Sequence, residues 1–224
     1  YIVALGTTSE SATLNESERA LVLETIIEQC RGRAAIVAGI GGNNTAEAVF
    51  RLKHGLPKGV AGVLSVVPYY NKPTQAGLVA HFTAIAAAVD VPIIIYNIKG
   101  RTGTNIETDT LKRIADAAPN IVAVKEASGD INQMMDVIAA IPDLAVYSGD
   151  DSMTLPLISL GGQGVISVVS NLVPAMVVNL VNCALEGDIA GARAVHYRLL
   201  PLIRAAFIET NPGPIKYAMN QRGM

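Results

Sequence analysis

Short apolar runs recur along the chain at nearly even spacing, and each is followed by a segment of helical character. The runs cover residues 2–6, 35–40, 62–67, 92–97, 121–126, 144–149 and 164–169. Successive runs begin about 20 to 33 residues apart, which is the length of one strand–helix unit. Because the runs are apolar at successive positions, they predict strands buried on both faces of a parallel sheet. The pattern therefore predicts an α/β fold.

Helix start signals lie between the runs. Asn15-Glu-Ser-Glu begins a helix that extends to about Cys30, and Asn44-Thr-Ala-Glu and Thr74-Gln-Ala-Gly begin two more. Further helices are predicted over residues 107–117, 131–140 and 152–160. Pro174 fits the first turn of another helix, and Asp188 caps a long final helix.

A doubly wound open sheet and a (β/α)8 barrel both fit this alternation. Seven runs are one fewer than a barrel needs. Even spacing, with polar residues at nearly every strand end, favours the barrel, in which all C-terminal strand ends meet at one mouth. We predict a single domain over residues 1–224, with barrel strands and helices over about 1–173. Residues 174–224 would form the final barrel helix and the start of a C-terminal helical segment.

The composition excludes several classes of protein. The 224 residues are 50% hydrophobic and 16% charged, which predicts a sizeable core. The net charge is -2 and no basic patch indicates a nucleic-acid partner. No apolar run reaches the roughly 18 residues of a membrane span, and no signal peptide is visible. The two cysteines, Cys30 and Cys183, lack a nearby partner, so we expect buried thiols and a cytoplasmic location.

Lys125 is out of place at the end of a buried strand. A lysine here is most simply a solvated side chain just past the strand end. Burial, however, lowers the pKa of an amine, and a neutral amine is a nucleophile that forms a Schiff base with a carbonyl compound. The other strand ends favour the second interpretation, because they carry hydroxyl groups and a guanidinium.

These strand-end residues predict a Schiff-base site for a keto acid. Tyr96 is a candidate general acid and base, and Thr7 and Tyr70 would extend a hydroxyl relay to water. Thr8, or a backbone N–H beside it, would hold the carboxylate of a keto acid, and Arg101 suits bidentate binding of a second carboxylate. Each residue alone has a simpler explanation: a packed tyrosine, a helix-capping threonine pair, and an arginine in a surface ion pair.

Two other motifs are weaker. Gly39-Ile-Gly41-Gly42-Asn43 faintly resembles a dinucleotide-binding loop, but it lacks the GxGxxG spacing and the later acidic residue. Asp150-Asp151 lacks further ligands at metal-binding spacing, so no metal site is predicted. His54, His81 and His196 are expected on the surface or between helices.

The motifs taken together carry a resemblance to a known family. They are Gly6-Thr-Thr-Ser-Glu-Ser-Ala-Thr-Leu14, Pro68-Tyr-Tyr-Asn-Lys-Pro73, Tyr96-Asn-Ile-Lys-Gly-Arg-Thr-Gly103, Val124-Lys-Glu-Ala-Ser-Gly129, Ser148-Gly-Asp-Asp151 and Gly164-Val-Ile-Ser-Val168. In this order, over essentially the whole chain, they resemble the 4-hydroxy-tetrahydrodipicolinate synthase family, also called dihydrodipicolinate synthases. The resemblance implies a (β/α)8 barrel of the class I aldolase type. It also implies a lyase that condenses pyruvate with L-aspartate 4-semialdehyde on the diaminopimelate route to lysine.

The resemblance assigns roles to individual residues. Lys125 would form the Schiff base with pyruvate, so no separate cofactor is expected, and Tyr96 would exchange protons. Thr7 and Tyr70 would complete the relay, and Tyr70 would come from the partner subunit across a tight dimer interface. The subunits would form a homotetramer, a dimer of dimers. The implied substrate-binding residues are Thr8 and Ile166 for pyruvate, Arg101 for the semialdehyde carboxylate, and Gly149.

Some members of the family are inhibited by lysine at the dimer interface. The residues that match that regulatory site are Ser11, Ala12, Asn43, Glu47 and Tyr69. Glu47 would pair with the ammonium group of the inhibitor. Arg19 stands where lysine-sensitive members often have a histidine, which argues against inhibition of this chain.

The chain departs from the family pattern in length and at two positions. Relative to the family, it lacks the first strand–helix unit and part of the C-terminal helical segment. Ser9 replaces a glycine or alanine, which would cost about 1 kcal/mol if the position required a positive φ, and Lys99 replaces a proline. Two alternatives remain: a related pyruvate-dependent aldolase such as an N-acetylneuraminate lyase, and a non-catalytic truncated fragment.

Overall fold

The computed structural model describes residues 1–224, which form two compact units, Tyr1–Ala145 and Val146–Met224. The first unit contains five strands that are parallel and follow one another in sequence order. They are β1 (Ile2–Ala4), β2 (Ile36–Gly39), β3 (Val60–Val66), β4 (Ile93–Asn97) and β5 (Ile121–Glu126). All five coincide with predicted apolar runs to within two residues at each end. Parallel order with a helix after every strand is the βα pattern that the sequence predicts.

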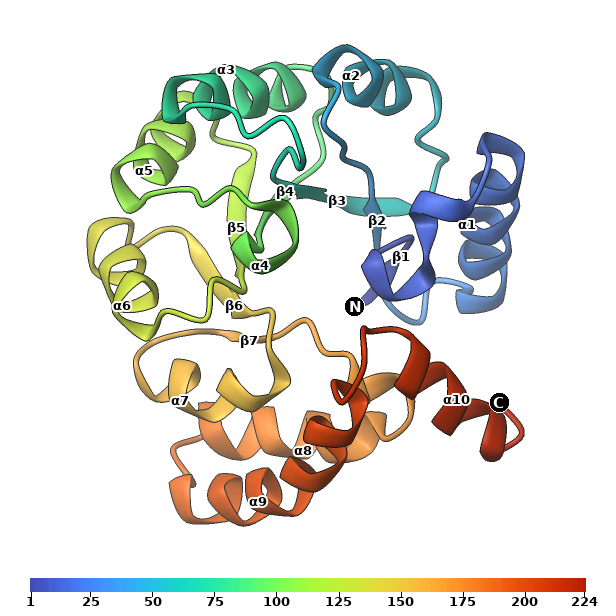
Figure 1. Cartoon of the computed structure of the whole chain (residues 1–224), viewed down its shortest axis with the longest axis vertical. Coiled ribbons are helices and arrows are strands. Elements are labelled where there is room, and N and C mark those ends of the chain that lie inside the picture. Colours follow the sequence, from blue (N-terminus) through green and yellow to red (C-terminus); the bar gives the residue numbers. More distant parts are fainter. The chain divides into compact units, whose positions relative to one another are not determined.

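Six helices belong to the first unit, and the longer ones line the outer side of its strands (Figure 1). They are α1 (Glu16–Cys30), α2 (Thr45–His54), α3 (Gln75–Ala86), α4 (Lys99–Thr102), α5 (Thr108–Ala117) and α6 (Ile131–Ala140). The predicted caps are present: Asn15 forms a capping box with Glu18, and the Asn44 and Thr74 side chains accept from backbone N–H groups of the next turn. The short helix α4 was not predicted.

The core of the first unit lies between the strands and these helices. All five residues of β4 are buried. From α3, Leu78, Phe82 and Ile85 are fully buried, and α5 contributes Ile114 in the same way. Burial of a large apolar side chain contributes about 1.5 to 3 kcal/mol, so these positions anchor α3 and α5.

The second unit is mainly helical. Strand β6 (Ala145–Ser148) pairs in parallel with the short strand β7 (Gly164–Val165) through Tyr147↔Gly164 and Ser148↔Val165. Its helices are α7 (Thr154–Ser159), α8 (Pro174–Leu185), α9 (Ile189–Ala206) and α10 (Gly213–Gln221). Helices α8 and α9 lie side by side (Figure 1), and their buried residues, among them Leu180, Leu199 and Ile203, form one apolar cluster. Pro174 and Asp188 begin α8 and α9 as predicted, but α9 is not the final helix, because α10 follows it.

The predicted strand 164–169 is wrong beyond Val165. The backbone N–H groups of Val168 and Val169 donate to the carboxylate of Asp151, at 2.8 and 3.4 Å, and the Ser167 hydroxyl donates to the same side chain. These bonds take the place of strand pairing, because each N–H has only one proton to donate. A short 3-10 helix, Val169–Asn171, follows.

Ser9 does not require a left-handed backbone. It lies in a 3-10 turn, Thr7–Ser9, and its hydroxyl donates to the Gly6 carbonyl at 2.6 Å. The positive φ, 56°, falls on Glu10 instead. The condition under which serine would cost stability is therefore not met at this position.

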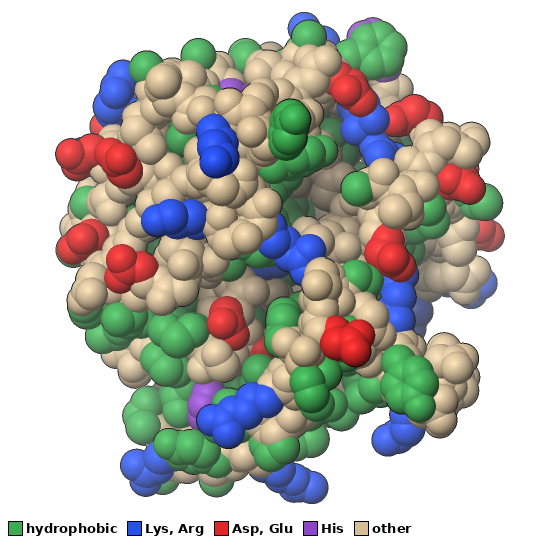
Figure 2. Space-filling view, viewed as in Figure 1, with side chains coloured by type: hydrophobic (Ala, Val, Ile, Leu, Met, Phe, Trp, Pro, Cys, Tyr) green, Lys and Arg blue, Asp and Glu red, His purple; other side chains and the backbone are tan.

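Acidic and basic side chains are interspersed on the face drawn in Figure 2. No helix is both long and apolar enough to cross a membrane. Both cysteines are free, with Cys30 buried and Cys183 half-buried.

Candidate active site

The candidate site of the first unit centres on the ends of β4 and β5. Tyr96 and Lys125 are paired in the register of the two strands, and the Lys125 Nζ lies 4.0 Å from the centroid of the Tyr96 ring. Both residues are buried, at 6% and 9% exposed. The ring face of tyrosine attracts a cation, which favours this contact. Because the amine and the phenol lie so close together, one small molecule can contact both.

Tyr96 also connects this pair to two other predicted residues. Its hydroxyl shares a hydrogen bond with the Thr7 side chain, and the charge of Arg101 acts on it. Burial raises the pKa of Tyr96 to about 12, and the Arg101 charge and the Thr7 bond offset only part of that effect. Tyr96 is therefore a neutral phenol at pH 7, able to donate a proton and take it back. As the sequence predicts, the fold brings together four of the candidate residues, namely Thr7, Tyr96, Arg101 and Lys125.

Tyr70 stands apart from these four residues. Its side chain is 89% exposed, in the loop that follows β3. Its φ is 71°, and Lys72 in the same loop has a φ of 46°. Left-handed backbone costs about 1 to 2 kcal/mol for a residue other than glycine, and such strain concentrates at functional sites. Thr8 is half-buried in the 3-10 turn that begins with Thr7.

Gly149 and Ile166 belong to the second unit, where they are neighbours at the end of the β6–β7 pair. The Ile166 N–H donates to the carbonyl of Ser148 at 2.9 Å. Ser148 also closes a tight turn over Gly149, because its hydroxyl donates to the Asp150 carbonyl at 2.6 Å. Asp151 then holds the segment after Ile166 through three hydrogen bonds. Sequence reasoning weighed Asp151 only as a metal ligand and missed this contact.

A cavity of about 680 Å³ opens beside two of these residues, Thr7 and Arg101, whereas Lys125 and Tyr96 do not line it. Thr7 and Arg101 line it, together with Tyr69 and apolar side chains of α1 and α2 such as Leu23 and Phe50. A volume of this size is typical of small-molecule sites. It leaves room for a substrate beside the Thr7 hydroxyl and the Arg101 guanidinium.

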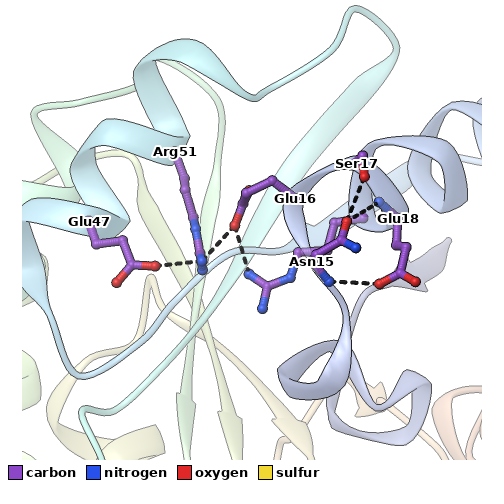
Figure 3. A network of polar contacts seen from close by, with 7 residues as sticks. Asn15, Glu16, Ser17, Glu18, Glu47 and Arg51 are labelled. Atoms are coloured by element: carbon purple, nitrogen blue, oxygen red, sulfur yellow. Dashed lines mark hydrogen bonds and ion pairs between the residues drawn. The ribbon is translucent and has the colours of Figure 1, made fainter.

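A second cavity, of about 170 Å³, contains four of the five predicted regulatory residues. Ala12, Asn43, Glu47 and Tyr69 line it, whereas Ser11 lines the larger cavity. Figure 3 shows Arg51 of α2 between two carboxylates. Its Nη2 lies 2.5 Å from Glu47 Oε1 and 2.7 Å from Glu16 Oε1.

Arg19 joins the same group of charges. Its Nη1 lies 3.4 Å from Glu16 Oε1, and Arg19 also lines the smaller cavity. The sequence pattern indicated Glu47 as an acceptor for an ammonium group, but it did not indicate that Arg51, one turn later on α2, already pairs with it. The spacing of four residues, which places two side chains on one helix face, was the available signal.

No group of three or more His, Cys, Asp or Glu side chains is arranged to hold a metal ion. It remains a prediction that the chain requires no metal ion and no separate cofactor. The same is true of the role assigned to each site residue.

A sequence model of the dihydrodipicolinate synthetase family matches residues 1–224. The chain belongs to this family. A 4-hydroxy-tetrahydrodipicolinate synthase of Protochlamydia amoebophila is 52% identical over 223 residues, which are 98% of this chain and 74% of that protein. Membership confirms the resemblance that the strand-end motifs carry.

Solved structures of the family have the same fold as this chain. The dihydrodipicolinate synthase of Aquifex aeolicus matches with a TM-score of 0.96 and 46% identity, covering 99% of this chain and 76% of that one. The Acinetobacter baumannii synthase, complexed with pyruvate, matches with a TM-score of 0.96 and 41% identity over the same shares. A Cyanidioschyzon merolae synthase with lysine bound matches with a TM-score of 0.95 and 43% identity, again over the same shares.

These comparisons confirm the predicted fold class, the (β/α)8 barrel type of the class I aldolases, and the predicted enzyme class, a lyase of lysine biosynthesis. They do not favour an N-acetylneuraminate lyase. The chain spans about three quarters of the length of these relatives, 74% to 76%.

Proposed function

We propose that this chain condenses pyruvate with L-aspartate 4-semialdehyde to 4-hydroxy-tetrahydrodipicolinate through a Schiff base on Lys125. The observation that carries the proposal is the buried pair of Lys125 and Tyr96, with Nζ 4.0 Å from the ring centroid. The complex of the Acinetobacter baumannii relative with pyruvate supports the choice of keto acid.

The first steps join pyruvate to the enzyme. Once it has lost a proton, the Lys125 amine attacks the C2 carbonyl of pyruvate; the nitrogen then gives up a further proton and the oxygen takes one up, which gives a carbinolamine. Loss of that oxygen as water leaves an imine, and loss of a methyl proton converts the imine into an enamine. Tyr96 suits the proton exchanges, because its pKa of about 12 keeps the phenol protonated between steps. Its hydrogen bond to Thr7 provides the next hydroxyl of a relay.

The later steps form the carbon–carbon bond and release the product. The enamine carbon attacks the aldehyde of the semialdehyde, and the substrate's own amine then displaces Lys125 and closes the ring. Arg101 suits the semialdehyde carboxylate, because a guanidinium binds a carboxylate in a bidentate manner. Thr8, Gly149 and Ile166 are proposed to hold pyruvate, Ile166 through its backbone.

The exposure of Tyr70 supports a role in a partner subunit. An aromatic side chain that is 89% exposed on a strained loop gains little from its own chain. We propose that Tyr70 completes the proton relay across a dimer interface, within a homotetramer. A cytoplasmic location is part of the same proposal.

The smaller cavity is proposed as the place where lysine would bind. In this chain Arg51 already lies 2.5 Å from Glu47, so an incoming ammonium group would compete with an internal guanidinium. Arg19, which also lines the cavity, adds a second positive charge. Lysine is therefore expected to inhibit this enzyme weakly or not at all.

Borohydride trapping tests the central step. Incubation with pyruvate and borohydride should reduce the imine to a stable adduct, which intact mass and peptide mapping should locate on Lys125. Lys125→Ala should abolish the adduct, whereas Lys58→Ala, at an exposed lysine, should leave it unchanged. An adduct that persists in Lys125→Ala would refute the assignment, and no adduct on folded wild-type protein would support a non-catalytic fragment.

The second substrate needs its own measurement. Product analysis with aspartate semialdehyde and, separately, with N-acetylmannosamine distinguishes the synthase from an N-acetylneuraminate lyase. Turnover of the sugar alone would contradict the proposal.

A further inference from the structure

Asn97 and Glu126 lie one residue beyond the candidate catalytic pair, on the same two strands. The register pairs Tyr96 with Lys125 and Asn97 with Glu126. Because successive side chains of a strand point to opposite faces, Asn97 and Glu126 project away from the side that carries Tyr96 and Lys125. Both are buried, at 1% and 0% exposed.

Amide donors surround the Glu126 carboxylate. Its Oε1 accepts from the Ser128 backbone N–H at 2.7 Å, and its Oε2 accepts from Asn97 Nδ2 at 3.0 Å and Gln133 Nε2 at 3.3 Å. An ionised carboxylate only accepts hydrogen bonds, so N–H groups converging on both oxygens match that form. A buried carboxylate is tolerated only where its oxygens are bonded in this way.

The same bonds reach two further segments. The Asn97 Oδ1 accepts from the Ile106 N–H at 3.2 Å, and Asn105 Nδ2 donates to Gln133 Oε1 at 2.7 Å. Asn105 and Ile106 lie just after α4, the short helix that carries Arg101, and Gln133 belongs to α6. We call Asn97, Asn105, Glu126 and Gln133 the Glu126 network. It joins the ends of β4 and β5 to α6 and to the segment after α4.

The Glu126 network lies on two strands whose register is shifted. Ile93 pairs with Ile121, but Ile94 pairs with Ala123, so the register shifts by one residue at this point. Without the shift, Tyr96 would stand opposite Val124 rather than Lys125. A shift of one residue exchanges the two faces of a strand, and the bond between Asn97 and Glu126 joins the last pair of residues in the shifted register.

We propose that Glu126 is a positioning residue that holds Lys125 opposite Tyr96 from the far side of the strands. This inference rests on the proposed function, because it explains how the Schiff-base lysine is placed. Glu126 does not touch substrate. It acts through the register of β4 and β5, and through Asn105 and Ile106 it also steadies the segment that follows Arg101.

The test compares Glu126→Gln with a paired exchange. In Glu126→Gln an amide NH₂ faces other N–H donors, so the register should loosen and kcat should fall about 10- to 100-fold, as a misplacement of about 1 Å does. The KM for pyruvate should change less. The rate of borohydride trapping on Lys125 at saturating pyruvate should fall in parallel. The double variant Asn97→Asp/Glu126→Gln restores one acid facing one amide and should recover most of the trapping rate.

Two single variants keep the test decisive if Glu126→Gln does not fold. Gln133→Met removes one donor to Glu126 and should slow trapping. Gln75→Met is the matched control, because Gln75 also bonds this segment, donating to the Asn105 carbonyl at 2.9 Å, but does not contact Glu126. Gln75→Met should trap at the wild-type rate.

The outcomes separate the two proposals. If wild-type protein gives no adduct on Lys125, the proposed function itself fails. If wild-type protein is labelled on Lys125, and a folded Glu126→Gln or Gln133→Met is labelled equally fast, only the positioning role is overturned. Loss of trapping that the double variant does not recover, with an unchanged melting temperature, would also refute the pairing of Asn97 with Glu126.

Discussion

At the scale of single residues, the site depends on how burial changes the pKa of the Tyr96 phenol. Tyr96 lies at the end of an apolar strand, and removal from water disfavours its phenolate, which raises its pKa to about 12. The nearby Arg101 charge and the Thr7 hydroxyl offset only part of this effect. Tyr96 therefore stays protonated throughout the neutral range, so the form present before reaction is the phenol that can donate a proton.

Tyr96→Phe should lower kcat by about 10² to 10⁴, the usual contribution of a positioned proton donor. The ring that faces Lys125 remains, so the melting temperature should change little. Steady-state kinetics with a thermal melt would check both statements. Tyr197→Phe, at an exposed tyrosine of α9, serves as the control and should match wild type. A Tyr96→Phe enzyme with wild-type kcat would remove Tyr96 from the relay.

At the scale of secondary-structure elements, an ion pair joins α1 to α2 at their exposed side. Glu16 of α1 lies 2.7 Å from Arg51 of α2, and Arg51 also pairs with Glu47 one turn earlier in its own helix (Figure 3). The arrangement decides which charges remain available to a ligand in the smaller cavity. Glu47 is the carboxylate there that suits an ammonium group, and it is already paired.

Arg51→Leu should therefore strengthen lysine binding. Exposed ion pairs are worth about 0.2 to 1 kcal/mol, so release of Glu47 should lower the Kd for lysine by a factor of about 1.4 to 5. Isothermal titration calorimetry would measure the change. Arg113→Leu, at an exposed arginine of α5, is the matched control. Equal lysine affinity in wild type and Arg51→Leu would show that the internal pair does not compete with the ligand.

At the scale of the whole molecule, one buried histidine couples folding stability to pH. His81 of α3 is 4% exposed, and its Nδ1 lies 2.8 Å from the Thr45 hydroxyl of α2. Burial lowers the pKa of His81 from 6.5 to about 4. The unfolded chain thus binds this proton at a higher pH than the folded chain does. The contribution to stability is complete above about pH 6.5 and is lost as the pH falls towards 4.

His81→Gln should flatten this pH dependence. Denaturant unfolding at several pH values between 4 and 7 would give the free energy of unfolding for wild type and variant. Carboxylates also titrate in this range, so the difference between the two curves is the quantity that reports on His81. A wild-type curve parallel to that of His81→Gln would exclude the histidine as a source of acid sensitivity.

Three features could be predicted without the structure: the alternation of strands and helices, the caps at Asn15, Asn44 and Thr74, and the family. These features depend on residues close together in the chain, so local patterns carry them. Lys125 and Tyr96 were also recognisable from the sequence, because polar residues at the ends of apolar strands stand out.

The partner that each of these side chains contacts could be learned from the folded structure alone. Local patterns do not specify the shift of register between β4 and β5. They also do not specify which side chains become partners, as in the bond between Thr7 and Tyr96, the pairing of Arg51 with Glu47, and the amides around Glu126. β7 is short for the same reason, since the Asp151 carboxylate takes backbone N–H groups that a strand would otherwise use. Such contacts depend on strand register and on competition between hydrogen-bond partners, and both are settled only when the chain has folded.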